Sequence, residues 1–229
     1  MERILKITSD GSHTLYVPEL NEHYHSIHGA VQESNHVFIE AGLKVVDSGQ
    51  WTVGRKRTIR VFEVGLGTGL NALLTYLEAK KQGIKIEYTA IEAFPLEKEI
   101  YTALNFSSVI TGENVDAILN LIHTSAWNTP VELSPDYVLV KRHDALENIV
   151  LETDKYDLVY FDAFAPEVQP ELWTEDIFRK IYNAMANGGI LVTYCCKGDV
   201  KRAMKAAGFT IEKLHGPPGK REMLRGKKF

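Results

Sequence analysis

The chain has 229 residues, of which 45% are hydrophobic and 24% are charged, and its formal net charge at pH 7 is −4. This composition is typical of a globular protein of one domain with an elaboration. No apolar run reaches the 18 residues that a membrane-spanning helix needs, and the first ten residues lack the apolar core of a signal peptide. We therefore expect a soluble, cytoplasmic protein with no membrane partner.

Disulfide and metal chemistry are not indicated. The only cysteines, Cys195 and Cys196, are adjacent, so they cannot supply a disulfide framework or a CxxC zinc site. Four histidines lie close together in the N-terminal part: His23, His25, His28 and His36. No carboxylate or thiol completes a metal-binding spacing around them. We therefore predict no metal, and we interpret the histidines as polar groups that line or cover a ligand site.

The N-terminal part predicts a hairpin and a cap. Two short β-type runs, residues 4–8 and 14–17, flank Asp10-Gly11, which is a hairpin signal. Apolar stretches at 37–41 and 43–46 bring the chain to the core. We divide the chain into a hairpin and cap segment, residues 1–50, packed on a main domain, residues 51–229, that starts with an exposed basic turn at 55–57.

A glycine-rich turn follows a buried strand. Residues 58–64 are β-branched and apolar, which predicts a parallel strand, and the apolar spacing from residue 70 predicts a helix. Gly65, Gly67 and Gly69 form the turn between them. Such a turn visits positive φ and lets a ligand approach the backbone, where free N–H groups at the helix start face it. A purely structural turn is the alternative interpretation.

The residues around this turn favour one ligand over another. The dinucleotide fingerprint needs a third glycine at position 70, where this chain has Leu70. Glu63, two residues before the first glycine, would repel a pyrophosphate and hold a cation, which favours S-adenosylmethionine over NAD. Glu92 ends the next predicted strand, 85–91, where a carboxylate suits a ribose diol. A solvated acid at a strand end is the alternative.

Further along, two acidic residues end predicted strands. A short helix in 97–106 and a helix at 113–125 lead to strand 137–140, which is followed by Asp144. Because this acid lies at the carboxyl edge of a parallel sheet, it could accept a hydrogen bond from the amino group of adenine. Strand 156–161 ends at Asp162, our candidate for the chemical step. The loop after it carries one aromatic ring, Phe164.

The remaining elements complete an α/β pattern. A helix from 170 to 185, stopped by 187–189, leads to strand 190–194, and a helix at 200–207 precedes strands 209–214 and 222–225. Alternating strands and helices predict a mainly parallel sheet with helices on both faces.

Charge is distributed unevenly along the chain. Residues 197–229 contain ten Lys or Arg against three Asp or Glu, a net charge of +7, so the remainder carries −11. Such asymmetry suggests an anionic partner for the basic segment. A solvated basic face is the alternative, because the inference of phosphate binding depends on clustering alone.

Four stretches together resemble a known family. FEVGLGTGLN, AIEAFPL, YFDAFAPEVQPELW and AAGFTIEKLHGPPGKREML are similar to the methyltransferase domain of the bifunctional enzymes that complete 5-methylaminomethyl-2-thiouridine at the tRNA wobble position. The similarity covers most of the chain and includes YHSIHGAVQESNHVFI near the N-terminus. It implies a class I, Rossmann-like methyltransferase fold with a mainly parallel seven-stranded sheet.

The resemblance also implies roles for individual residues. S-adenosylmethionine would bind at Glu63, Gly65, Gly67, Thr68, Gly69 and Asn71, with its ribose at Glu92 and its adenine at Asp144. Catalysis would take place around Asp162, with Phe164 beside the substrate. We further expect Tyr24 and Ser26 near the ligand. Phosphates of tRNA would be held by Lys220 and Arg221 above all, together with Lys213 and Arg225.

The implied reaction is N-methylation of the aminomethyl group of 5-aminomethyluridine, or its 2-thio form, in the tRNA anticodon. The family's oxidase domain is not seen after Phe229, so we expect methylation alone, with the amine supplied by upstream enzymes. Two alternatives stay open: a methyltransferase of a small amine, and a non-catalytic RNA-binding module with the same fold. A nicotinamide enzyme is disfavoured because Leu70 replaces the third glycine.

Overall fold

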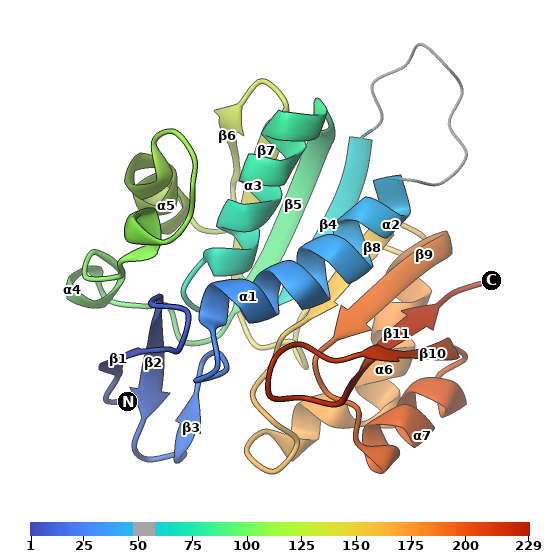
Figure 1. The fold of residues 1–229 in the computed structure, drawn as a ribbon. Coiled ribbons are helices and arrows are strands. Elements are labelled where there is room, and N and C mark those ends of the chain that lie inside the picture. Colours follow the sequence, from blue (N-terminus) through green and yellow to red (C-terminus); the bar gives the residue numbers. More distant parts are fainter. Residues whose placement is uncertain (48–57) are drawn as a thin grey trace.

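The computed structural model describes residues 1–47 and 58–229. Within them, a main sheet of eight strands has the order β10-β11-β9-β8-β4-β5-β7-β6 (Figure 1). Its strands are β4 (Thr58–Val64), β5 (Lys85–Glu92), β6 (Pro130–Ser134), β7 (Tyr137–His143), β8 (Tyr156–Phe161), β9 (Met185–Thr193), β10 (Thr210–His215) and β11 (Glu222–Lys227). The turn at 55–57 and the domain boundary after residue 50 lie outside the described residues.

The centre of the sheet is parallel, as predicted. β4 pairs with both β5 and β8, β5 pairs with β7, and β8 pairs with β9, all in parallel. β11 is antiparallel to β9 and to β10, and β6 is antiparallel to β7. The predicted number of seven strands was one too low, because β6 was not predicted. This edge strand buries none of its five residues fully, so it carries no apolar run that sequence could reveal.

Helices cover both faces of the sheet (Figure 1). On one face lie α3 (Leu70–Gln82), α5 (Val115–Thr124) and a continuous helix made of α1 (Ala30–Ser34), η1 (Asn35–Leu43) and α2 (Lys44–Asp47). On the other face lie α6 (Glu175–Ala184) and α7 (Gly198–Ala206). Two buried apolar clusters, one on each face, form the core. No helix in the described ranges has both the length and the apolar character to cross a bilayer.

The helix over residues 30–47 was not predicted. Its middle part, η1, is a π-helix, and its buried apolar residues are Val37, Phe38, Ile39 and Leu43. A π-helix has i→i+5 hydrogen bonds, so these residues do not repeat at α-helical spacing. Gly42 lets the helix approach the sheet closely, since a Cβ there would lie 3.2 Å from ring atom Cε1 of Tyr160.

A second, smaller sheet lies beside the carboxyl end of the main one. The predicted hairpin is confirmed as β1 (Ile4–Ile7) and β2 (His13–Val17), which pair antiparallel, and β3 (Glu22–His23) adds a short third strand. Two short helices, α4 (Lys98–Tyr101) and η2 (Phe106–Ser108), occupy the region where one short helix was predicted.

The predicted helix from 170 to 185 is divided in two. A 3-10 turn, η3 (Pro170–Trp173), precedes α6, whose N-cap Thr174 accepts a hydrogen bond from the N–H of Ile177. The sequence suggested that residues 187–189 stop this helix, but α6 already ends at Ala184. Met185 is already extended, and β9 starts there directly.

Candidate active site

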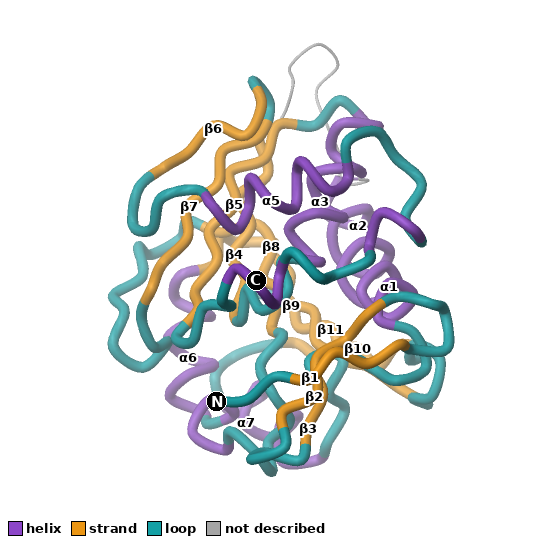
Figure 2. Tube along the Cα trace, turned by 90° about the vertical axis from the view of Figure 1, so that its left-hand side faces the viewer, coloured by secondary structure: helices purple, strands orange, loops and turns teal. Residues whose placement is uncertain are grey.

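A cavity of about 690 Å³ lies at the carboxyl ends of the central strands, between the main sheet and the segment that joins β3 to α1. Its lining includes these predicted site residues: Tyr24, Ser26, Gly65, Gly67, Thr68, Asn71, Glu92, Asp144, Asp162, Phe164 and Lys220. Five others are not among the lining residues: Glu63, Gly69, Lys213, Arg221 and Arg225. The loops that form the cavity gather around the ends of the sheet in Figure 2.

The glycine turn forms one wall of the cavity. Gly65 has a φ of +87°, and a Cβ at this position would lie only 2.8 Å from the carbonyl oxygen of Asp162. Gly67 also has positive φ, and its N–H donates to Oε2 of Glu92 at 2.9 Å. Gly69 is the left-handed N-cap of α3. Backbone and neighbouring loop are thus packed so tightly that only glycine fits at Gly65.

Glu92 braces this turn from the end of β5. Its second carboxylate oxygen, Oε1, accepts from the N–H of Phe94 at 2.8 Å. Both oxygens therefore hold backbone in place, and the carboxylate faces the cavity in a fixed orientation. Ribose binding by Glu92 stays a prediction. Asp144 is exposed at the far side, where its Oδ1 accepts from the N–H of Ala145 at 2.8 Å.

Glu63 lies beneath the cavity floor. Its side chain is fully buried, and burial raises its pKa well above the usual range, with the charge of Asp162 adding to the effect. Glu63 does not line the cavity, so direct contact between its carboxylate and a ligand is not supported, although its position next to the turn is as predicted.

Two histidines, the buried His25 and the half-buried His123, hold Thr68, at the centre of the turn. Nε2 of His25 lies 3.4 Å from Oγ1 of Thr68, and Nε2 of His123 donates to its carbonyl oxygen at 3.0 Å. Burial lowers the pKa of both histidines to about 4, so both are neutral near pH 7. His123 itself is held by buried Lys141, whose Nζ donates to its carbonyl at 2.6 Å.

The other histidines have different positions. His23 and His28 line the cavity with His25, which agrees with the interpretation made from the sequence. His36 does not line it, because its Nε2 is bonded to the carbonyl of His215 at 2.8 Å. Within the described residues, no three His, Cys, Asp or Glu side chains are grouped so as to hold a metal ion.

Asp162 stands where β8 meets the cavity. Its N–H donates to the carbonyl of Val64 at 3.1 Å, which fixes the strand end beside the glycine turn. Its Oδ2 accepts from Nδ2 of Asn71 at 2.8 Å. Burial raises the pKa of Asp162 to about 7, the charge of Glu33 adds to this, and the amide of Asn71 opposes it. A carboxyl with a pKa near neutrality can both take up and release a proton.

The loop after Asp162 presents an aromatic ring. The N–H of Phe164 donates to Oε1 of Gln169, and its carbonyl accepts from Nε1 of Trp173, so the loop is fixed at both sides. The Phe164 ring packs edge-on against Tyr24, with centroids 5.0 Å apart and an interplanar angle of 82°. Tyr24 in turn contacts the glycine turn, since a Cβ on Gly67 would lie 3.0 Å from its ring.

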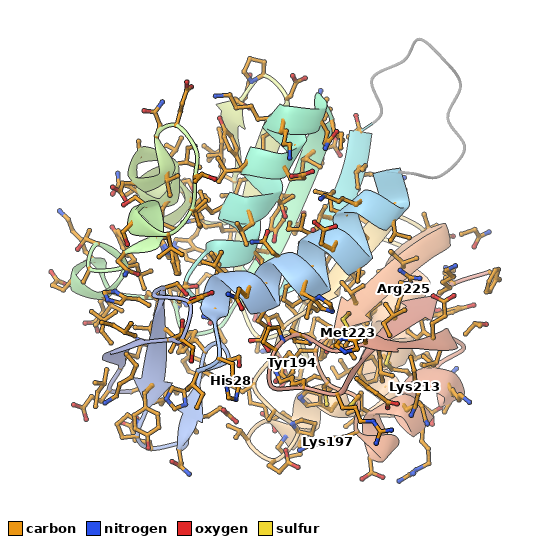
Figure 3. The ribbon with its side chains drawn as sticks, in the orientation of Figure 1. His28, Tyr194, Lys197, Lys213, Met223 and Arg225 are labelled. Carbon is orange, nitrogen blue, oxygen red and sulfur yellow. The ribbon has the colours of Figure 1, made fainter. Side chains whose placement is uncertain are left out.

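Sequence reasoning missed Glu33 and Tyr194, which form a third wall. Nζ of Lys220 lies 2.5 Å from Oε1 of Glu33 and 3.9 Å above the ring of Tyr194. Glu33 is 6% exposed and also accepts from the N–H of Ser26 at 2.7 Å. No signal marked Glu33 in the sequence, because it lies in the helix that was not predicted. Figure 3 shows Tyr194 at the centre of the molecule, near His28.

The lining favours a cationic ligand. Two lysines, Lys197 and Lys220, line the cavity together with seven acids: Glu22, Glu33, Glu92, Asp144, Glu147, Asp162 and Glu171. Oδ1 of Asn71 is buried next to the Glu63 carboxyl, so this side chain links the cavity floor to Asp162. The volume matches that of small-molecule sites in general. A ligand with sulfonium and ammonium groups, such as S-adenosylmethionine, fits these features.

Two of the four predicted phosphate-binding residues are engaged elsewhere. Lys213 pairs with Glu222 at 2.7 Å, and Arg225 pairs with Glu212 at 2.7 Å and donates to the carbonyl of Ala41 (Figure 3). Lys220 points into the cavity. Arg221 is exposed beside it. The structure thus does not support the prediction that all four side chains meet phosphates, because three of them satisfy acids of this chain.

Comparisons with known proteins agree with the fold and the site. Residues 122–229 match a family described as S-adenosyl-L-methionine-dependent methyltransferases. A bifunctional tRNA 5-methylaminomethyl-2-thiouridine biosynthesis protein, MnmC, of Burkholderia multivorans is 30% identical over 97% of this chain and 34% of its own length. Its counterpart in Burkholderia thailandensis is 31% identical over 93% of this chain. The chain spans about a third of the length of these curated relatives.

Solved structures show the same architecture. MnmC2 from Aquifex aeolicus superposes with a TM-score of 0.78 and 25% identity, over 99% of this chain and 70% of that one. Spermidine synthase from Thermotoga maritima shares the fold alone, with a TM-score of 0.54 and 10% identity over 99% of this chain and 72% of that one. Fold and comparisons together define the fold of S-adenosylmethionine-dependent methyltransferases. Within that class, the chain resembles the methyltransferase portion of the MnmC proteins.

Proposed function

We propose that this protein transfers a methyl group from S-adenosylmethionine to the aminomethyl nitrogen of 5-aminomethyluridine, or its 2-thio form, at the tRNA wobble position. The observation that carries the proposal is the position of Asp162. This carboxyl lies in the same cavity as the glycine turn, beside the Phe164 ring and among six other acids. Such surroundings suit an amine that reacts next to a bound cationic cofactor.

The cofactor would be held by the turn and its neighbours. Thr68, Gly65 and Gly67 present the backbone, Glu92 faces the ribose, Asp144 faces the adenine, and Asn71 lies beside the ammonium group. Bound S-adenosylmethionine supplies an electrophilic methyl group on sulfur. Tyr24 and Ser26 close the cavity from the cap segment. These roles are supported by the position of every one of these residues at the cavity lining.

The chain's own residues prepare the amine. An aliphatic amine is mostly protonated at neutral pH, like the lysine ammonium, and only its neutral form has a lone pair to react. Asp162, oriented by Asn71, can take the proton on its carboxylate. Holding the nitrogen in line with the methyl group contributes roughly 7 to 11 kcal/mol to lowering the barrier. A base flipped out of the anticodon stack would meet the Phe164 ring.

One observation favours a small amine as the alternative substrate. Seven of the ten basic residues of 197–229 are paired with acids of this chain: Lys197, Arg202, Lys213, Lys220, Arg225, Lys227 and Lys228. These seven residues pair with six acids, three of which belong to the same segment, so pairing lowers the net charge of the segment from +7 to +4. For Lys201, Lys205 and Arg221, no acid of the described residues lies in ion-pair contact, so a smaller basic surface persists.

The deciding experiment measures methyl transfer from labelled S-adenosylmethionine to three substrates. These are tRNA with an aminomethylated wobble uridine, the same tRNA with the carboxymethylated form, and a polyamine. We expect transfer to the aminomethylated tRNA alone. Transfer only to the polyamine, or none despite tight cofactor binding, would overturn the substrate assignment and leave the methyltransferase fold intact.

A further inference from the structure

Lys220 occupies a position that its predicted role as a phosphate-binding residue does not explain. It lies on the turn between β10 and β11, which the sequence suggested as a phosphate-binding element. Instead its ammonium lines the cavity, held by Glu33 and placed on the Tyr194 face. The turn is docked against the cap segment: a Cβ on Gly219 would lie 2.1 Å from ring atom Cδ2 of His28. The lysine is therefore fixed inside the site.

A fixed cation has a specific effect on an amine nearby. A second positive charge is disfavoured next to the first, so the neutral form of the amine becomes more favourable. The same cation stabilises the charged form of a neighbouring carboxylate. The charge of Lys220 lowers the pKa of Asp162, and the charge of Glu33 raises it. The effect of Glu33 on Asp162 is the larger of the two, so Lys220 offsets it in part.

We propose that Lys220 is a positioning residue: its fixed positive charge, held against Tyr194, offsets the negative charge of Glu33 at Asp162, so that the reacting amine can give up its proton to Asp162. This inference rests on the proposed function. The amine, as –NH₃⁺, loses one proton to the Asp162 carboxylate. Its lone pair then forms the N–C bond while the C–S bond breaks, which gives a secondary methylammonium and a neutral thioether, and the Asp162 proton passes to water.

Other charged and titratable groups surround Lys220 and must be considered. They are Glu33 on α1, His25 and His28 before it, Asp162 after β8, and Tyr194, Cys195 and Lys197 after β9. His25 is neutral because burial lowers its pKa to about 4. Burial raises the pKa of Tyr194 and Cys195, so both are neutral as well. Lys197 pairs with Glu167 on the outer side. Glu33 and Lys220 thus carry the charges that shift the pKa of Asp162 in opposite directions.

The test removes each charge of the pair in turn. Lys220→Met leaves Glu33 uncompensated, whereas Glu33→Gln leaves Lys220 uncompensated. We expect the acidic limb of the pH profile of methyl transfer to move up by about one pH unit in the first variant and down by a similar amount in the second. At a fixed pH on that limb, one unit corresponds to about tenfold in rate. The pH limb of the double variant should lie between those of the two single variants, because the two charges act on Asp162 in opposite directions.

A second measurement does not depend on any substrate. The titration of Asp162 is followed by carboxyl ¹³C NMR, with the resonance assigned from Asp162→Asn, in the wild type and the same variants. Its midpoint should rise in Lys220→Met and fall in Glu33→Gln. The matched control is Lys213→Met with Glu222→Gln, which breaks an ion pair of similar length outside the cavity. The control should leave both measurements unchanged.

The outcomes separate the two proposals. If the wild type methylates no tRNA, the proposed function is wrong, while the Asp162 titration still tests the ion pair. Equal loss of activity in both variants, with no opposite shifts, would show a purely structural pair and overturn the inference. An unchanged pH profile, together with weaker tRNA binding and a reduced salt dependence of binding in Lys220→Met, would return Lys220 to the phosphate-binding role.

Discussion

Gly65 and Gly83 both have positive φ, yet only one of them is crowded. A Cβ on Gly65 would lie 2.8 Å from the Asp162 carbonyl, whereas a Cβ on Gly83 would meet nothing within 4 Å. Gly83→Ala should therefore cost about 1 kcal/mol of unfolding free energy, from backbone strain alone. Gly65→Ala should cost about 2 to 4 kcal/mol and also weaken cofactor binding, because Asp162 must move. Urea unfolding and calorimetric titration check both; equal costs would contradict the close approach.

Asp162 is the residue whose loss should affect chemistry and spare binding. Replacing it by Asn keeps the size and the contact to Asn71 but removes the proton acceptor. We expect single-turnover methyl transfer to fall by about 10² to 10⁴, the usual contribution of a general base. Cofactor affinity should stay within a few-fold. Asp176→Asn, at an exposed position on α6, is the control; wild-type turnover in Asp162→Asn would sink the assignment.

For single residues, the sequence predicted which residues form the site better than it predicted their burial and the direction of their side chains. The glycines, Glu92 and Asp162 follow strand ends, and strand ends of a parallel sheet meet at one edge, so their grouping was predictable. Burial of Glu63 and the inward direction of Lys220 depend on packing between distant segments. A spacing rule contains no information about either.

The glycine turn depends on elements that reach it from both sides. His123, on α5, is half-buried, and desolvation lowers its pKa to about 4 from an ordinary 6.5, so it is neutral near pH 7. The unfolded chain therefore binds the proton first, and stability contributed here is complete above pH 6.5 and is lost as pH falls toward 4. The loss amounts to about 3 kcal/mol over this window. His123→Gln should reduce the loss of unfolding free energy between pH 6.5 and pH 4 by about 3 kcal/mol.

Urea midpoints between pH 4 and pH 7 measure this prediction. Asp162 titrates in the same range with the opposite sign, so the difference between wild type and variant is the informative quantity. Asn120→Gln, at an exposed position on α5, should leave the slope as it is. Parallel pH dependences of the wild type and His123→Gln would mean that His123 is not held neutral.

Elements with regular periodicity were predicted within a few residues, as β4, α3, β8 and α7 show. Two elements were missed for physical reasons. β6 is an edge strand with little burial, and helix 30–47 contains a π-helical stretch whose apolar residues fall out of α-helical phase. The division of 170–185 into η3 and α6 depends on the Thr174 cap, which competes with a continuous helix.

At the scale of the whole molecule, ion pairing decides which cations are free for a polyanion. We expect Arg221→Ala to weaken tRNA binding and to reduce the salt dependence by about one unit of slope, as for one phosphate contact. Arg225→Ala should instead lower stability, since Arg225 holds Glu212 and the Ala41 carbonyl. Filter binding over a salt series distinguishes them. If both variants had the same salt slope of tRNA binding, the prediction that Arg221 is the cation free to contact a phosphate would be contradicted.

The strand order has a consequence for how the protein is made. β11 follows both β9 and β10 in the chain but is inserted between them. Until residues 222–227 leave the ribosome, one edge of β9, with buried Ile190, Leu191 and Val192, has no partner. At about 5 to 20 residues per second, the nascent chain exposes this edge for several seconds. Slowed translation of residues 194–227 should therefore increase aggregation and chaperone dependence.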